Sequence, residues 1–60
     1  MPAACILVVD DDPLQRWAVR EQLQSWGYQV TEAENAEAAL RAYRTAAPDL
    51  VLLDLKLGAD

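Results

Sequence analysis

The feature that most constrains this chain is a pair of short apolar runs, each of which stops at an aspartate. Cys5–Val9 is rich in β-branched residues and stops at Asp10, and Leu50–Leu53 stops at Asp54. A short, continuous apolar run is typical of a strand that is buried on both faces, as in a parallel sheet. We therefore predict two buried strands, each followed by a carboxylate at its carboxyl end.

A helix is expected directly after the first run. Asp12 stands before Pro13, so the aspartate can cap the helix and the proline can open its first turn. The helix is predicted from Pro13 to about Trp26, and Gly27 supplies the left-handed residue that ends it. Its apolar stripe is expected to consist of Leu14, Trp17, Ala18 and Leu23. The polar residues Gln15, Arg16, Arg20, Glu21 and Gln22 are assigned mainly to the solvent side.

A second strand and a second helix are expected before the second apolar run. The strand Gln29–Ala33 is more polar than the first, which suits an edge position in the sheet. Asn35 is expected to cap a helix over Ala36–Ala46, with Glu37 in the first turn, where negative charge is favoured. Asp49 is assigned to the turn that follows. The helical spacing gives this helix a predicted apolar face of Ala36, Ala39, Leu40 and Tyr43.

The predicted order of elements is therefore β-α-β-α-β. Strands that alternate with helices imply right-handed crossovers and a doubly wound, parallel α/β sheet. The chain has 60 residues, which allows at most one small domain, whereas doubly wound sheets usually have about five or six strands. Two interpretations follow: the chain is the first half of a larger domain, or two copies cover each other's missing surface.

Composition excludes several classes of protein. The 53% hydrophobic and 25% charged content is that of an ordinary globular domain. The net charge of −5 argues against nucleic-acid contact by this segment, and no apolar run approaches the ~20 residues that cross a membrane. Residues 1–4 lack the basic start of a signal peptide, so a cytoplasmic protein is expected. Cys5 is the only cysteine and there is no histidine, which excludes a zinc site of the usual kind. We interpret Cys5 as a small core residue, with a reactive thiol as the alternative.

Three carboxylates are expected to meet at one edge of the sheet. If the first strand lies between the other two, Asp10, Asp11 and Asp54 converge at the carboxyl ends, where open α/β sheets bind ligands. Carboxylates this close repel one another, and Mg²⁺ is a hard cation that relieves the repulsion and commonly bridges carboxylates to phosphate. An aspartate can then act as the nucleophile in phosphoryl transfer. Asp12 needs no such role, because capping explains it.

Four segments in this order and spacing resemble the start of a response-regulator receiver domain of two-component signalling. They are Ile6–Pro13, Gly27–Val30, Glu32–Leu40 and Pro48–Leu55. The resemblance implies a flavodoxin-like fold, of which the sequence holds the first three strands and two helices. Residues 1–60 are accordingly assigned to the N-terminal, truncated part of one receiver domain.

The resemblance also implies the site and its partners. Asp54 matches the phosphoacceptor, Asp10 and Asp11 match the acidic pair with Asp11 as the direct Mg²⁺ ligand, and the backbone carbonyl of Lys56 matches the third protein ligand. A sensor histidine kinase is the implied phosphoryl donor, and an output such as transcription is the implied response. The domain is then a phosphoacceptor in signalling and not an enzyme.

Two departures from the family pattern leave other interpretations open. Leu57 and Gly58 stand where the family often has Met-Pro. Similar Leu-Gly loops occur in regulators that resemble the nitrogen-regulation type, which activate σ54-dependent transcription. The Ser/Thr and Lys that sense the phosphoryl group in receivers would follow strands four and five, beyond this sequence. The alternative is a self-associating half-domain, a homodimer with a structural role only. A haloacid-dehalogenase-like phosphatase is disfavoured, because Lys56 stands where its second acid is needed.

Overall fold

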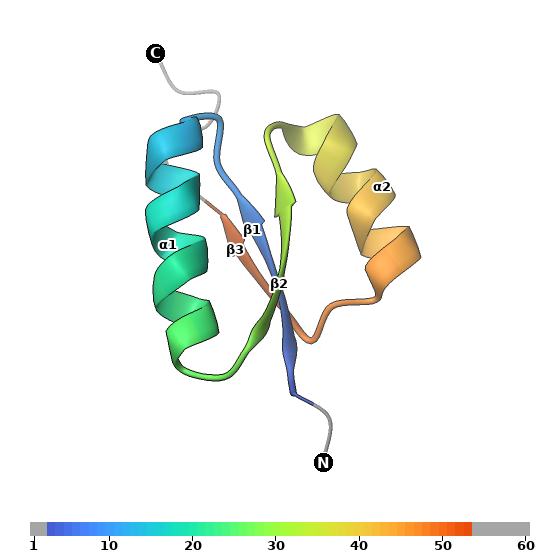
Figure 1. The fold of residues 1–60 in the computed structure, drawn as a ribbon. Coiled ribbons are helices and arrows are strands. Elements are labelled where there is room, and N and C mark those ends of the chain that lie inside the picture. The colour runs from blue at the N-terminus through green and yellow to red at the C-terminus, as the bar shows by residue number, and fades with distance from the viewer. Residues whose placement is uncertain (1–2, 54–60) are drawn as a thin grey trace.

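The computed structural model describes residues 3–53 and contains the five elements in the predicted order (Figure 1). They are β1 (Cys5–Val9), α1 (Pro13–Ser25), β2 (Gln29–Ala33), α2 (Ala36–Ala46) and β3 (Leu50–Leu53). The bounds agree with the prediction except that α1 ends one residue earlier, at Ser25, with Trp26 as its C-cap.

The three strands form a parallel sheet in the order β2-β1-β3, with β1 in the centre. Val9, the last residue of β1, is paired with Ala33 on one side and with Leu53 on the other. The strands therefore end together at one edge of the sheet. The helices α1 and α2 cover opposite faces (Figure 1), as the flavodoxin-like α/β class requires, so the predicted fold class is confirmed.

The central strand contributes to two cores. Ile6 and Val8 face α1, where they pack with Leu23 and with the partly buried Val19 and Val30. The alternate residues face α2, where the second core consists of Leu7, Val9 and Ala33 together with Ala38, Ala39 and Ala42. Since β1 is covered on both sides, its continuous apolar run is explained.

Both ends of α1 follow the predicted capping chemistry. The Asp12 carboxylate accepts hydrogen bonds from the backbone N–H groups of Leu14 (3.0 Å) and Gln15 (3.4 Å). At the other end, Gly27 has φ +92°, and its N–H and that of Tyr28 close the last turn onto Gln24 and Leu23. This is a Schellman motif, for which glycine is favoured because it has no Cβ.

The predicted apolar stripe of α1 is wrong in three of its four residues. Leu23 is buried, but Leu14, Trp17 and Ala18 are exposed. The face that meets the sheet is instead Arg16, Val19, Arg20 and Leu23, which follow the spacing i, i+3, i+4, i+7. The two arginines, predicted for the solvent side, are partly buried because they bond to a glutamate of β2.

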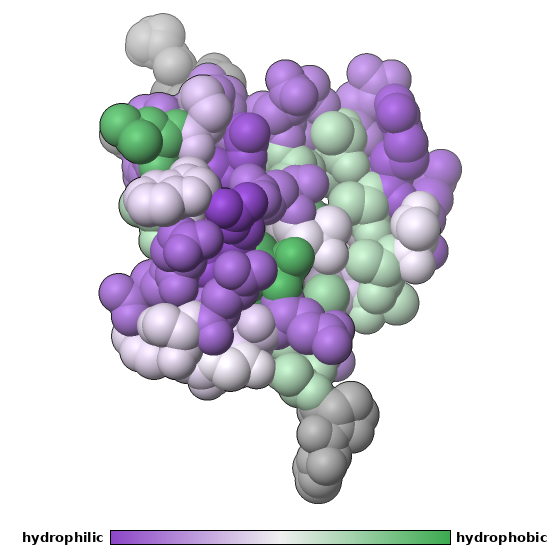
Figure 2. Space-filling view, viewed as in Figure 1, coloured by the Kyte–Doolittle hydropathy of each residue, from purple (hydrophilic) through white to green (hydrophobic). Residues whose placement is uncertain are grey.

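The apolar face predicted for α2 is also wrong, apart from Ala39. Leu40 and Tyr43 are each 54% exposed and Ala36 is exposed. The side turned to the sheet holds only small residues, namely Ala38, Ala39 and Ala42. Alanines let the helix lie close to the sheet, so the larger side chains are left outside. Figure 2 shows the result as weakly apolar surface along α2 and hydrophilic surface over much of α1.

The prediction that β3 is buried is wrong for the part of the chain that the structure describes. All four of its residues are exposed, from 37% at Leu52 to 59% at Leu53. Within residues 3–53, β3 packs only against β1. A contiguous apolar surface of this kind marks a place where protein packs. Neither helix described here has the length and apolarity needed to span a membrane.

Replacing Leu7 by alanine should lower the free energy of unfolding by about 2–5 kcal/mol, because its side chain is only 1% exposed between β1 and α2. Urea denaturation of the protein followed by circular dichroism measures this loss. The matched control is Leu40→Ala, at a half-exposed position on α2, which should change stability by less than about 0.5 kcal/mol. Equal losses in the two variants would contradict the described core.

Candidate functional site

The candidate site lies where the parallel strands end. Asp10 follows the last residue of β1, and β3 ends at Leu53, which is paired with Val9. Two residues of the predicted site, Asp54 and Lys56, lie outside the described residues, so the structure does not test their placement. The described part of the site is the junction between β1 and α1, which carries Asp10 and Asp11.

Asp10 is fixed at three points. Its backbone N–H donates to the Ala33 carbonyl (3.0 Å), which ties the ends of β1 and β2 together. Its Oδ1 accepts a hydrogen bond from the N–H of Asp12 (2.9 Å), and its carbonyl accepts one from Nη1 of Arg16 (2.7 Å). The residue is 3% exposed, whereas the adjacent Asp11 is exposed. A buried carboxylate and an accessible one thus stand side by side in sequence.

The other two aspartates near the strands have structural roles, as predicted. Asp12 caps α1. Asp49 lies in the turn before β3, at the opposite end of the sheet. Its Oδ2 accepts a hydrogen bond from the N–H of Cys5 (2.8 Å), and its own N–H donates to the Cys5 carbonyl (2.8 Å). Cys5, interpreted as a core residue, is only half-buried, and its Sγ lies 3.7 Å from Oγ1 of Thr31.

A charged cluster between α1 and β2 was missed by the sequence reasoning. Arg16 Nε lies 3.0 Å from Oε1 of Glu32, and Arg20 Nη1 lies 2.9 Å from Oε2 of the same carboxylate. Arg20 also pairs with Glu21 at 3.2 Å. A signal was available, because Arg16 and Arg20 share the helical face of Leu23 and Glu32 has the side-chain direction of Val30 in the pleat.

The pKa of Glu32 is held below its usual value. Desolvation of the carboxyl acts to raise the pKa, but the hydrogen bonds and charges of Arg20 and Arg16 outweigh it. For Arg20, the hydrogen bond to Glu32 is the main reason that the pKa of the guanidinium is raised. The cluster is therefore ionised at neutral pH and stabilises the packing of α1 on β2.

The donor chemistry at the strand ends suits a magnesium ion. Asp10 and Asp11 offer carboxylate oxygens, the ligands that Mg²⁺ prefers. Within residues 3–53, no arginine or lysine forms an ion pair with either carboxylate, and Arg16 contacts the carbonyl of Asp10 instead. No group of three metal-binding side chains occurs among these described residues, so a complete site would need a ligand from elsewhere.

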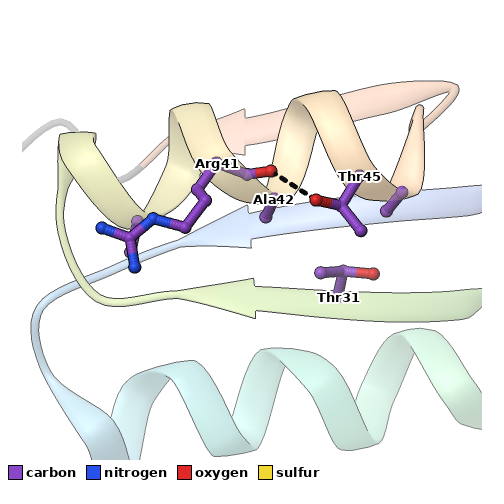
Figure 3. Close-up of a pocket in the computed structure, with 6 residues that line it drawn as sticks. Thr31, Arg41, Ala42 and Thr45 are labelled. Carbon is purple, nitrogen blue, oxygen red and sulfur yellow. Dashed lines mark hydrogen bonds between the residues drawn. The ribbon is translucent and has the colours of Figure 1, made fainter.

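The described surface has hollows on both faces of the sheet. One, of about 150 Å³, lies between β1, β3 and α1 and reaches Asp10 and Leu53. The other, of about 310 Å³, is an open groove between α2 and β2 that is lined mainly by alanines and threonines (Figure 3). In this groove the Thr45 hydroxyl donates to the Arg41 carbonyl (3.0 Å). The hollow at the strand ends is smaller, but Asp10 is one of the residues that line it.

These features define a doubly wound, parallel α/β domain with an acidic pair at the carboxyl end of its central strand. The response regulator receiver domain is the family that matches this chain, over residues 6–60. Because the match covers almost the whole chain, the chain belongs to the response regulator receiver domain family.

Curated relatives agree with this assignment. The transcriptional regulatory protein KdpE of Mycobacterium tuberculosis is 46% identical over 52 residues, which are 87% of this chain and 23% of the relative. The chemotaxis protein CheY of Bacillus subtilis is 38% identical over 53 residues, 87% of this chain and 44% of the relative. Protein PilH of Pseudomonas aeruginosa is 38% identical over 52 residues, 87% of this chain and 43% of the relative.

The chain spans less than half the length of each of these relatives. No solved structure gives a significant match. The family and the fold are thus established, whereas the activity and partners of a whole protein are matters for proposal.

Replacing Glu32 by glutamine should destabilise the protein by about 1 kcal/mol at neutral pH, because two arginines lose a charged acceptor. Since the pKa of Glu32 is lowered on folding, its stabilisation is complete above the usual glutamate value of 4.5. It is lost as the pH falls through the lowered pKa. Urea denaturation of parent and variant across this range measures the difference.

The control is Glu37→Gln, which removes an exposed ion pair with Arg41 at 3.7 Å. Its effect should be smaller at every pH. A stability difference for Glu32→Gln that stays constant from neutral to acidic pH would contradict the ionised cluster.

Proposed function

We propose that this chain is the phosphoacceptor part of a response regulator, in which Asp54 receives a phosphoryl group from a sensor histidine kinase. The single observation that carries the proposal is the family match over residues 6–60. The buried Asp10 at the end of β1, next to the strand that leads to Asp54, supports it. We propose Asp10, Asp11, Asp54 and the carbonyl of Lys56 as the residues that hold Mg²⁺.

The reaction that we propose is a transfer between two side chains. An Asp54 carboxylate oxygen forms a bond to phosphorus while the bond from phosphorus to the histidine nitrogen of the kinase breaks. Bound Mg²⁺ would neutralise charge on the phosphoryl oxygens. Asp10 and Asp11 bind the cation, and neither forms a bond to phosphorus. The domain is then an acceptor of the group and not an enzyme, and its expected location is the cytoplasm.

The response that phosphorylation would control is proposed from the names of the relatives. KdpE and ZraR, the latter from Klebsiella oxytoca and 42% identical over 52 residues, are named as transcriptional regulatory proteins. CheY is named as a chemotaxis protein. Control of transcription is thus one output that the relatives support, and the link to σ54-dependent regulators stays a prediction from Leu57 and Gly58.

The apolar surface of β3 favours a second candidate, in which copies of this chain associate and have a structural role. Leu50 and Leu53 are each more than half exposed, at 52% and 59%. Under this candidate, sedimentation velocity at micromolar concentration gives a dimer that Leu52→Glu dissociates. A folded monomer would contradict it.

Incubation of the protein with Mg²⁺ and a small phosphodonor such as acetyl phosphate should label Asp54 and should fail in Asp54→Asn. Asp11→Asn should lower the rate at least about tenfold, because a charged metal ligand becomes neutral. Phosphate content is measured by electrophoresis on a phosphate-binding gel and by mass spectrometry of the modified peptide.

Asp12→Asn is the matched control, because asparagine caps a helix as well as aspartate does and Asp12 has no role in the proposed site. This variant should be labelled at close to the parent rate. Labelling of Asp54→Asn equal to that of the parent would exclude Asp54 as the acceptor.

A further inference from the structure

The hydrogen bonds of the β1–α1 junction hold the two residues next to Asp11, namely Asp10 and Asp12. Within residues 3–53 the side chain of Asp11 forms no hydrogen bond or ion pair, and it is exposed. A metal ligand of this kind must be directed by its backbone. The two peptide groups on either side of Asp11 therefore set the direction of its Cα–Cβ bond, from which the carboxylate extends.

Both of these peptide groups are fixed. The Asp10–Asp11 peptide is held through the Asp10 carbonyl, which accepts from Nη1 of Arg16 at 2.7 Å. The Asp11–Asp12 peptide is held through the Asp12 N–H, which donates to Oδ1 of Asp10 at 2.9 Å. Since a peptide group is planar, one hydrogen bond to each fixes the backbone on both sides of Asp11.

Arg16, which donates to the carbonyl of the Asp10–Asp11 peptide, is itself held in place. While Nη1 of Arg16 reaches Asp10, Nε of the same guanidinium donates to Oε1 of Glu32 at 3.0 Å. The side chain of Arg16 is 19% exposed, so these bonds are largely shielded from water. We call this connection, from Glu32 through Arg16 to the Asp10 carbonyl, the Arg16 bridge.

If Arg16 served only to pair with Glu32, it would not need the second hydrogen bond to the Asp10 carbonyl. Glu32 already has a second partner, because its Oε2 accepts from Arg20. The shortest bond of Arg16 is directed to the backbone that carries the acidic pair and not to a carboxylate. Arginine suits the task because its planar group donates in two fixed directions, whereas lysine has one nitrogen.

We propose that Arg16 is a positioning residue for Mg²⁺ binding, which acts through the Asp10 carbonyl to direct the carboxylate of Asp11. The inference rests on the proposed function, because it concerns the metal site of that reaction. Among residues 3–53, the Arg16 guanidinium bonds to Glu32 and to the Asp10 carbonyl and to neither carboxylate of the acidic pair.

The test compares Arg16→Lys with Arg20→Lys in the full protein. Both substitutions keep a positive charge next to Glu32, but only Arg16 also bonds to the Asp10 carbonyl. Titration with MgCl₂ by isothermal calorimetry should give a dissociation constant for Mg²⁺ that is raised about 10–100-fold in Arg16→Lys. Losses of this size are usual when a hydrogen-bond partner that orients a metal ligand is removed. The constant for Arg20→Lys should stay within about twofold of the parent.

A second measurement does not depend on the metal. Amide hydrogen exchange followed by NMR without Mg²⁺ should show faster exchange of the Asp12 N–H in Arg16→Lys and an unchanged rate in Arg20→Lys. Circular dichroism at the working temperature establishes that both variants are folded. If Arg16→Lys is unfolded, Glu32→Gln replaces it with the same expected direction, because the loss of the carboxylate charge weakens the bond that orients Arg16.

The outcomes separate the inference from the proposed function. Parent-like Mg²⁺ affinity in folded Arg16→Lys would overturn the positioning role. An equal loss of affinity in Arg20→Lys would also overturn it, because the effect would then come from Glu32, which both arginines contact. If the parent binds no Mg²⁺, the proposed metal site is wrong. The exchange rate of the Asp12 amide then decides whether the Arg16 bridge holds the junction.

Discussion

The rest of the structure depends on the pairing of β1 with a parallel strand on each side. This pairing puts β1 in the middle of the sheet, so that its side chains alternate between two cores. It also forces the three strands to end at one edge, with Val9 between Ala33 and Leu53. Asp10 is then buried because it is the next residue of a buried strand, and its backbone N–H completes the pairing with β2.

Turn chemistry converts this edge into a defined site. Asp12 caps α1 with its side chain, and its carbonyl accepts the first helical bond, from the N–H of Arg16 at 2.9 Å. The start of the helix thereby places the Arg16 side chain back toward the end of β1. Local capping and the long-range contact with Glu32 thus act on the same residues of the junction.

The order and bounds of the elements could be predicted because local signals decide them. The capping residues Asp12 and Asn35, a glycine at the left-handed position and two apolar runs give nearly the observed ends of most elements. The helical faces could not be predicted in the same way. Apolar character and helical spacing predict Leu14 in the core of α1 and Leu40 in that of α2, but both side chains are exposed.

Each error arises from a tertiary contact that local sequence does not show. On α1 the inner face accommodates two arginines because an ionised glutamate on β2 satisfies them, a fact that only the paired strand reveals. On α2 alanines set the close approach, so Leu40 and Tyr43 are left exposed. The exposure of β3 follows from its having β1 as its only neighbour among the elements of residues 3–53. The predicted cap role of Asp12 is confirmed, since it follows from local sequence. The metal-binding role of Asp10 stays a prediction, and Asp54 and Lys56 lie outside the described residues.

The charges around the junction favour a divalent cation at the proposed site. An arginine next to a metal site would by itself repel the ion. Here Arg16 and Arg20 are balanced by Glu32 and Glu21, which they contact within 3.2 Å. The two arginines are therefore matched by two glutamates, and among the described residues no cation pairs with the carboxyl groups of Asp10 and Asp11. Arg16 can thus order the backbone of the acidic pair without neutralising the carboxylates that would bind Mg²⁺, which explains why its hydrogen bond is directed to a carbonyl oxygen.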